Sequence, residues 1–286
     1  MANTISTYCK EYVNDELELL KIFNTNSLTQ DLLKGYIKHT GKIISYDSVS
    51  FSAAAVVGTF SRSVGYTDLD ITATRVDKTL SQDIGNALKL DIMDRDEAQI
   101  EKGIIGLYNR YVAKLLIPTV DKYRLSAIAP YNSNTEVVGS VLTSSTIISK
   151  LLADKKKMGN NRVKWEECIV YMGETNKSLL DEASLGKGYL ELGAWNGNMD
   201  ATVEKFKGAK IVTVPDSWLP SSVNYICIHP LAAAAFVVHQ EAEFFDKIPG
   251  HGGRMLELDV GFYHDCWLEP AAADTGVVVN VTGTRA

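Results

Sequence analysis

Two short stretches of this 286-residue chain carry residue types that could bind a metal ion. His239-Gln240-Glu241 matches the H-x-E half of a zinc-deaminase signature, but the P-C-x-x-C half is absent. In His264-Asp265-Cys266, strand geometry places His264 and Cys266 on one face and Asp265 on the other. The simpler interpretation of His264 is a structural histidine inside a strand, with its ring nitrogens hydrogen-bonded. We therefore predict no catalytic, cofactor-binding or metal site, and the alternative is a metal-dependent enzyme that uses His239, Glu241 and His264.

The other chemical motifs are incomplete. The stretch LGKGYLELG at 185–193 begins like a dinucleotide-binding loop, but Glu191 stands where the third glycine is needed. Asp68-x-Asp70 lacks the glycine of a calcium loop. His251, in the turn PGHGG, could be a surface residue or a catalytic base. Nothing in the sequence assembles a nucleophile, a base and an oxyanion site.

The composition describes a folded, mildly acidic protein. Hydrophobic residues make up 45% of the chain and charged residues 22%, which excludes a disordered chain. The formal net charge of −6 argues against a protein that coats nucleic acid. One basic run, Lys155-Lys156-Lys157 with Arg162 and Lys164, is interpreted as the solvated end of a helix rather than a nucleic-acid patch.

The cysteines and the apolar runs indicate the compartment. The four cysteines form no C-x-x-C pair, which favours free thiols in a reducing cytosol over a zinc or redox motif. The first residues lack the pattern of a signal peptide, and the longest apolar run, at 231–238, is too short to cross a bilayer. We expect a soluble protein.

A two-stranded projection is predicted between residues 42 and 93. Residues 48–52 and 70–74 alternate with the period of two that is typical of strands, with Gly58 and Gly65 between them. This region has too few large apolar residues to form its own core. Because an isolated hairpin is marginal in water, we expect another surface, such as a second copy of the chain, to cover it.

A long amphipathic helix is predicted over residues 94–117. Apolar residues recur at steps of three and four, at Ile100, Ile104, Leu107, Tyr108, Tyr111 and Leu115. Gly103 and Gly106 inside this helix indicate either close backbone packing or a point of bending. Pro118 follows, where a kink is expected.

The rest of the chain alternates irregularly between helices and strands. Helices are predicted near 147–159 and 177–183, and strands at 168–172, 211–214, 225–228, 255–269 and 276–282. This order lacks the strict alternation of a doubly wound sheet and predicts an α+β fold.

Two motifs around the long helix resemble those of a known family. Asp91-Ile92-Met93-Asp94 precedes the helix, and Ile117-Pro118-Thr119-Val120-Asp121-Lys122-Tyr123-Arg124 ends it. Together with the order of elements, they resemble the major capsid proteins of tailed bacteriophages, which have the Hong Kong 97-type fold also used by encapsulin shells. Thr119 departs from the family, in which an acidic residue is common at this position.

The resemblance implies a division of the chain and a function. It implies an N-terminal arm (1–41), an extended loop with a strand of the peripheral domain (42–93), the spine helix of the peripheral domain (94–129), an axial domain (130–245), and peripheral return strands with the C-terminal tail (246–286). Copies would form the hexamers and pentamers of an icosahedral virion shell around double-stranded DNA, assembled in the host cytoplasm. Expected partners are a separate scaffolding protein, a portal protein and possible decoration proteins, with no membrane and no cofactor. An encapsulin-like compartment is the alternative.

The sequence leaves the role of Asp121 and Arg124 open. They are three residues apart, so they can pair along one helical face or with a neighbouring segment. They could equally form a surface ion pair worth less than about 1 kcal/mol.

Overall fold

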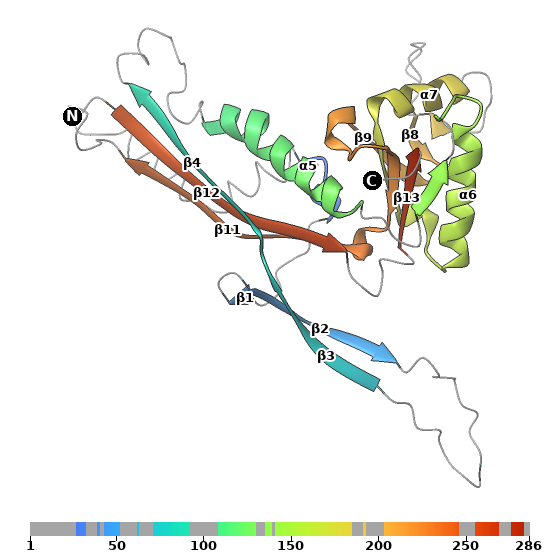
Figure 1. Cartoon of the computed structure of the whole chain (residues 1–286), viewed down its shortest axis with the longest axis horizontal. Helices are drawn as coiled ribbons and strands as arrows, with labels where there is room; N and C mark the ends of the chain where they lie inside the picture. Colours follow the sequence, from blue (N-terminus) through green and yellow to red (C-terminus); the bar gives the residue numbers. More distant parts are fainter. Residues whose placement is uncertain are drawn as a thin grey trace.

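The described part of the computed structural model contains two sheets, a long helix on the smaller sheet, the helices α6 (Ile147–Asn160) and α7 (Glu174–Ser184) on the larger one, and a projecting ribbon (Figure 1). The structure describes residues 27–32, 39–40, 43–51, 62, 71–91, 108–129, 135–138, 141–184, 191–192, 203–245, 255–268 and 276–282.

The larger sheet has seven strands in the order β5-β13-β10-β6-β9-β8-β7. Its central strands are antiparallel at β13–β10 and β10–β6, and parallel at β6–β9. The strands are β5 (Thr135–Val138), β6 (Ile169–Gly173), β7 (Glu191–Leu192), β8 (Val203–Phe206), β9 (Ala209–Val214), β10 (Val223–Ile228) and β13 (Val277–Thr282). The mixture of directions confirms the α+β prediction.

Both faces of this sheet are covered, which explains why its central strands read as continuous apolar runs. Val170 and Met172 face the helices α6 and α7 in one core. Their strand neighbours Ile169 and Tyr171 face a second core on the other side, built with residues 125–129 and the arm segment 27–32.

The smaller sheet joins three long strands in the order β11-β12-β4. They are β4 (Gln82–Asp91), β11 (Ala233–Phe245) and β12 (Met255–Leu268), all antiparallel. The long helix lies along this sheet (Figure 1), and its Tyr108, Val112 and Val120 pack against Leu258 and Phe262 of β12.

The long helix changes register before its proline. Residues 108–111 are α-helical, Val112–Leu116 form a π-helical segment, and α5 covers Ile117–Ala127 across Pro118. Leu115, predicted to lie on the buried stripe, is 61% exposed, while Leu116 and Ile117 are buried. That prediction was wrong because the π segment adds one residue to a turn and rotates the later positions.

The ribbon projects away from both sheets (Figure 1). It consists of β2 (Ile43–Phe51) and β3 (Ile71–Thr79), antiparallel throughout, with the short β1 (His39–Thr40) beside β2. The predicted two-stranded projection is confirmed. At its base, Ile44 and Leu80 pack on Phe236 and Tyr263.

The sequence placed a domain boundary at residue 245, between an axial domain and the peripheral return strands. The sheets do not divide the strands at that residue. β11, at 233–245, lies in the three-stranded sheet with β12, and β13, at 277–282, returns to the seven-stranded sheet. The Ala-rich start of β11 is buried, whereas the sequence indicated only an apolar run there. Among the described residues, no helix is both long and apolar enough to cross a membrane.

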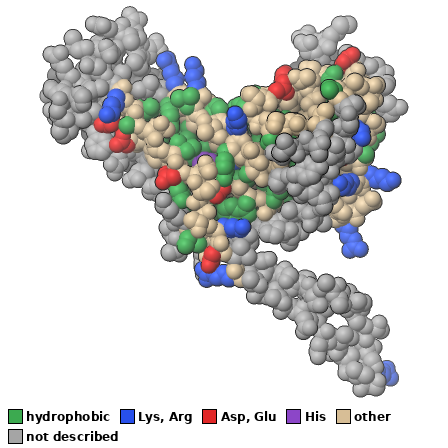
Figure 2. Space-filling view, in the orientation of Figure 1, with side chains coloured by type: hydrophobic (Ala, Val, Ile, Leu, Met, Phe, Trp, Pro, Cys, Tyr) green, Lys and Arg blue, Asp and Glu red, His purple; other side chains and the backbone are tan. Residues whose placement is uncertain are grey.

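The lysine run lies in the last turns of α6, as predicted. Lys156 is exposed, and Lys155 and Lys157 are half-buried. Their place in the last turns of an exposed helix end, on the side of the molecule where Figure 2 shows basic side chains at the surface, favours the solvated helix end over a nucleic-acid patch.

Gly173, where β6 meets α7, lies in a space too small for a larger residue. A Cβ at this position would collide with Asp216, whose carboxylate accepts hydrogen bonds from the backbone N–H and hydroxyl of Thr175 at 3.2 and 2.6 Å. We expect Gly173→Ala to lower the free energy of unfolding by roughly 1–3 kcal/mol, measured by denaturant titration. The control is Gly85→Ala, because a Cβ at Gly85 meets nothing within 4 Å. Equal stability of both variants would contradict the packing account.

Candidate functional site: a buried polar junction at the end of the long helix

The Asp121 carboxylate binds the N-terminal arm segment. Ser27 and Thr29 each donate a hydroxyl hydrogen bond to its Oδ1 at 2.6 Å, and the Leu28 backbone N–H donates to Oδ2 at 2.9 Å. Asp121 has 0% exposure, so burial removes its hydrogen bonds to water. These three donors replace them. More than 90 residues of sequence separate the two partners. This contact therefore fixes the arm segment on the helix.

Arg124 completes the attachment one helical turn later. Its Nη1 donates to the Thr29 hydroxyl oxygen at 3.1 Å, so Thr29 accepts from Arg124 while it donates to Asp121. Leu32 adds its side chain to the core shared by the helix end and the seven-stranded sheet. Lys210 of β9 pairs with Asp31 at 2.6 Å. The arm segment 27–32 thus joins the helix to the sheet.

The interpretation of Asp121 and Arg124 as a surface ion pair is wrong. Both side chains have 0% exposure, and both bind the same segment, residues 27–29. The open alternative, contact with a neighbouring segment, is the one that the structure shows. Sequence reasoning could not find this segment as the partner, because Ser27-Leu28-Thr29 resembles an ordinary polar turn.

A second carboxylate fixes the joint between the ribbon and the sheet. Asp265 of β12 accepts a hydrogen bond from the Ser81 backbone N–H at 2.9 Å and from the Tyr123 hydroxyl at 2.6 Å. The Tyr263 hydroxyl donates to the Leu80 carbonyl at 2.8 Å. Leu80 and Ser81 are the two residues between β3 and β4. The direction of the ribbon therefore depends on contacts with β12 and the long helix.

Burial favours the neutral forms of Tyr123 and His264 beside the Asp265 carboxylate. Desolvation, followed by the hydrogen bond to Asp265, raises the pKa of Tyr123, so the phenol retains its hydrogen and donates it. Desolvation, followed by the charge of Arg124, lowers the pKa of His264 from 6.5 to about 4. His264 lies edge-on to the Tyr123 ring at 5.4 Å. Its Nδ1 has no hydrogen-bond partner among the described residues, so the prediction of hydrogen-bonded ring nitrogens does not hold for this atom.

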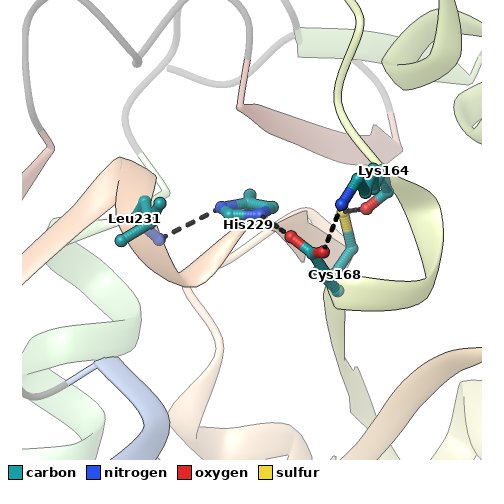
Figure 3. Close-up of polar contacts among 5 residues, drawn as sticks. Lys164, Cys168, His229 and Leu231 are labelled. Carbon is teal, nitrogen blue, oxygen red and sulfur yellow. Dashed lines mark hydrogen bonds and ion pairs between the residues drawn. The ribbon is translucent and has the colours of Figure 1, made fainter.

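A chain of polar contacts holds the crossing from β10 to β11, between the two sheets (Figure 3). The Leu231 backbone N–H donates to His229 Nδ1 at 3.2 Å. The neutral ring therefore carries its hydrogen on Nε2, which lies 3.2 Å from Glu167. Glu167 also pairs with Lys164 at 3.0 Å. The hydrogen bond with Lys164 has the largest effect in lowering the pKa of Glu167, and the hydrogen bond with His229 comes next.

The strand register gives the backbone positions of the residues considered for a metal site, and the side chains of His239 and Glu241 lie outside the described part of the structure. His239 and Glu241 lie in β11 and pair in register with Tyr263 and Gly261, whereas His264 pairs with Val237. Within the described ranges, no three His, Cys, Asp or Glu side chains are grouped so that they could hold a metal ion. The other candidates, His251, Asp68, Asp70, Gly103 and Gly106, lie outside the described residues.

Comparison with solved structures finds this arrangement in phage capsids. A capsid structure of the cyanophage P-SCSP1u matches with a TM-score of 0.68 at 13% identity, covering 90% of this chain and 88% of that chain. The mature capsid of bacteriophage PhiM1 matches at 0.61 and 11% identity, covering 91% and 88%. This chain has the fold of a phage capsid protein. A structure of Mycobacterium phage Che8 gives 0.58 at 19% identity, covering 84% and 85%.

The resemblance expected from the sequence is therefore confirmed as a likeness of fold. No family model and no curated protein sequence matches the chain, so the likeness to phage capsids rests on three-dimensional structure. The first match covers about nine tenths of both chains in one comparison.

Asp121→Asn tests the attachment of the arm segment. An amide cannot accept all three hydrogen bonds and carries no charge to balance Arg124, so we expect a loss of about 3 kcal/mol in the free energy of unfolding. Denaturant titration of the unassembled chain measures it. The matched control is Asp77→Asn, because Asp77 accepts from Ser45 and Arg75 on the exposed ribbon. A loss no larger than that of the control would show that the arm contact does not stabilise the fold.

His264 predicts a pH dependence of stability. Its pKa is about 4 in the folded chain and 6.5 when unperturbed, so the unfolded state binds more protons between these values. Stability should be complete above pH 6.5 and fall by roughly 3 kcal/mol as the pH approaches 4.

The measurement is denaturant unfolding at several pH values for the wild type and His264→Gln. The variant should lose less stability over this window, since glutamine does not titrate. Parallel curves for the two proteins would rule out His264 as the source.

Proposed function

We propose that this chain is the major head protein of a tailed bacteriophage, many copies of which assemble into an icosahedral shell around double-stranded DNA. The observation that carries the proposal is the capsid fold, shared over about 90% of the chain with a cyanophage capsid structure. The role is structural, and no catalytic step is assigned to any residue.

The ribbon supports assembly as the function. Arg75, Asp77, Lys78 and Thr79 of β3 are exposed. The ribbon sheet contains only β1, β2 and β3 among the described strands, so it has no second layer of its own. A two-stranded element of this kind is stabilised when another surface covers it. In the proposed shell, that surface belongs to an adjacent copy, and the contact repeats around hexamers and pentamers.

The buried junction supports the same role. Asp121 and Asp265 connect the arm segment, the long helix, the ribbon joint and β12. A shell protein must hold its projecting parts at defined angles, because small angular errors accumulate around a closed surface. Fixed hydrogen bonds at the roots of the arm and the ribbon meet this requirement.

The expected partners and internal divisions follow as parts of the proposal. The ribbon of the extended loop (42–93) and the part of the arm (1–41) outside residues 27–32 reach neighbouring copies, the spine helix (94–129) supports them, and the axial domain surrounds the capsomer axis. A separate scaffolding protein directs assembly in the host cytoplasm, a portal protein occupies one vertex, and decoration proteins can bind outside. The net charge of −6 suits a container whose wall does not bind the packaged DNA tightly.

Electron microscopy tests the proposal. The full chain is expressed alone and together with the neighbouring genes, and purified material is imaged by negative stain. We expect closed particles of uniform size in the co-expression sample, with DNA protected from nuclease in particles from infected cells. Particles that hold an enzyme cargo would support an encapsulin-like compartment instead. A monodisperse monomer with bound metal would support the enzyme alternative and end the proposal.

A shortened ribbon tests its role directly. Phe51 and Ile71 are paired neighbours across the ribbon, so residues 52–70 can be replaced by Asn-Gly, which closes a two-residue hairpin turn. We expect unchanged stability of the monomer but no closed particles, because the part that reaches the adjacent copy is missing. The control is Arg75→Lys in the full-length ribbon, which should still form closed particles. Normal particles from the shortened chain would contradict the role of the ribbon in assembly.

A further inference from the structure

The buried side chains of the long helix do not fit an uninterrupted α-helix. Six buried residues recur at steps of four: Tyr108, Val112, Leu116, Val120, Arg124 and Ile128. Each residue of an α-helix turns by about 100°, so each step of four advances the buried position by about 40°. Over five steps the buried face would move by about 200°, nearly to the opposite side. The π segment Val112–Leu116 adds one residue to a turn and removes about 100° of this rotation.

The C-terminal end of the helix has partners that the N-terminal end lacks. Tyr108 and Val112, and beyond the π segment Ile117 and Val120, pack on the three-stranded sheet. Asp121 and Arg124 bind the arm segment, and Leu125 packs in the core of the seven-stranded sheet. The π segment lies between these two ends. It therefore accommodates the rotation between the packing of Tyr108 and Val112 on the sheet and the attachment of the helix end to the arm segment.

The sequence at the π segment suits a second register. Leu115, Leu116 and Ile117 are three consecutive apolar residues, of which Leu115 is 61% exposed and Ile117 is 4% exposed. In an uninterrupted α-helix, Leu115 would lie seven residues after Tyr108 and four after Tyr111, on the buried face. Ile117 would then point to the opposite side. An apolar side chain thus occupies the buried position in either register, and exposed Leu115 is the one that the second register would bury.

We propose that the arm segment 27–32 is an effector that sets the register of the long helix. While Ser27 and Thr29 occupy Asp121 and Arg124, the helix keeps its π segment. When the arm segment leaves, the helix relaxes to an uninterrupted α-helix, Leu115 turns inward and Ile117 turns outward. Residues 120–127 then rotate by about 100° relative to residues 108–111.

The rotation reaches the ribbon through Tyr123. This residue lies on the rotating part of the helix and donates to Asp265, which also holds the Ser81 backbone at the ribbon joint. Rotation by about 100° removes the Tyr123 hydroxyl from that carboxylate. The state of the arm therefore controls one of the bonds that fix the direction of the ribbon. The inference rests on the fold alone and goes beyond the proposed shell function.

Thiol labelling of the unassembled full chain tests the register. Leu115→Cys and Ile117→Cys are made separately in a Cys9→Ser background, in which Cys168, Cys227 and Cys266 are buried. With the native arm, the thiol at 115 should react with a maleimide at least about tenfold faster than the thiol at 117. Adding Ser27→Ala and Thr29→Val, which remove the arm hydroxyls, should reverse this order. Reversal separates a change of register from local unfolding, which would accelerate both reactions.

The control for the arm variant is Ser149→Ala, which removes an exposed hydroxyl bond to the Thr146 carbonyl on α6. It should leave the order of the two rates unchanged. An unchanged order in the arm variant, or fast labelling at both positions, would overturn the proposal. Because unassembled chain is labelled, failure to form shells would count against the proposed function and not against this inference.

Deletion of Leu115 gives a second test that does not depend on the arm variant folding. Removing the extra residue should produce an uninterrupted helix with both ends still bound. We expect a free energy of unfolding equal to or above that of the wild type, and unchanged hydrogen-exchange protection of residues 27–32. A destabilised chain, or loss of protection at the arm segment, would show that the π segment does not relieve a mismatch.

Discussion

One buried carboxylate determines how the parts of this protein are held together. Asp121 has 0% exposure and accepts three hydrogen bonds, all from the arm segment. A buried charge without such donors would destabilise the fold by several kcal/mol. The helix end can therefore be buried only when the arm segment covers it. This constraint makes the N-terminal segment part of the core rather than an appendage.

The same arrangement repeats at the root of the ribbon. Asp265 is also buried and also accepts from backbone and side-chain donors that lie far apart in the sequence. Hydrogen bonds have preferred directions, whereas apolar contacts do not. Two buried carboxylates thus fix angles that a purely apolar core would leave variable. In the proposed shell, projecting segments meet other copies at repeated positions, and fixed angles at their roots would serve that role.

Much of the fold could be predicted from the sequence, and the failures have physical causes. The central strands β6, β9, β10 and β13 of the seven-stranded sheet were predicted because burial on both faces makes them apolar, as in Ile169–Gly173. The short strands β5, β7 and β8 were not predicted. Leu115 was misplaced because helical periodicity assumes an uninterrupted α-helix, and one π segment shifts every later residue. The burial of Asp121 and Arg124 could not be predicted, since charged residues are rarely buried and their partners are distant in sequence. The resemblance to capsid proteins was found from short motifs at this same helix end.

The most direct test is a cryo-electron microscopy reconstruction of the assembled particle at side-chain resolution. The account predicts a closed icosahedral shell in which each ribbon lies on an adjacent copy. Within every copy, Asp121 should contact a Ser27–Thr29 segment while residues 112–116 are π-helical. A shell in which the ribbon folds back on its own subunit, or a protein that forms no shell under any condition, would contradict it.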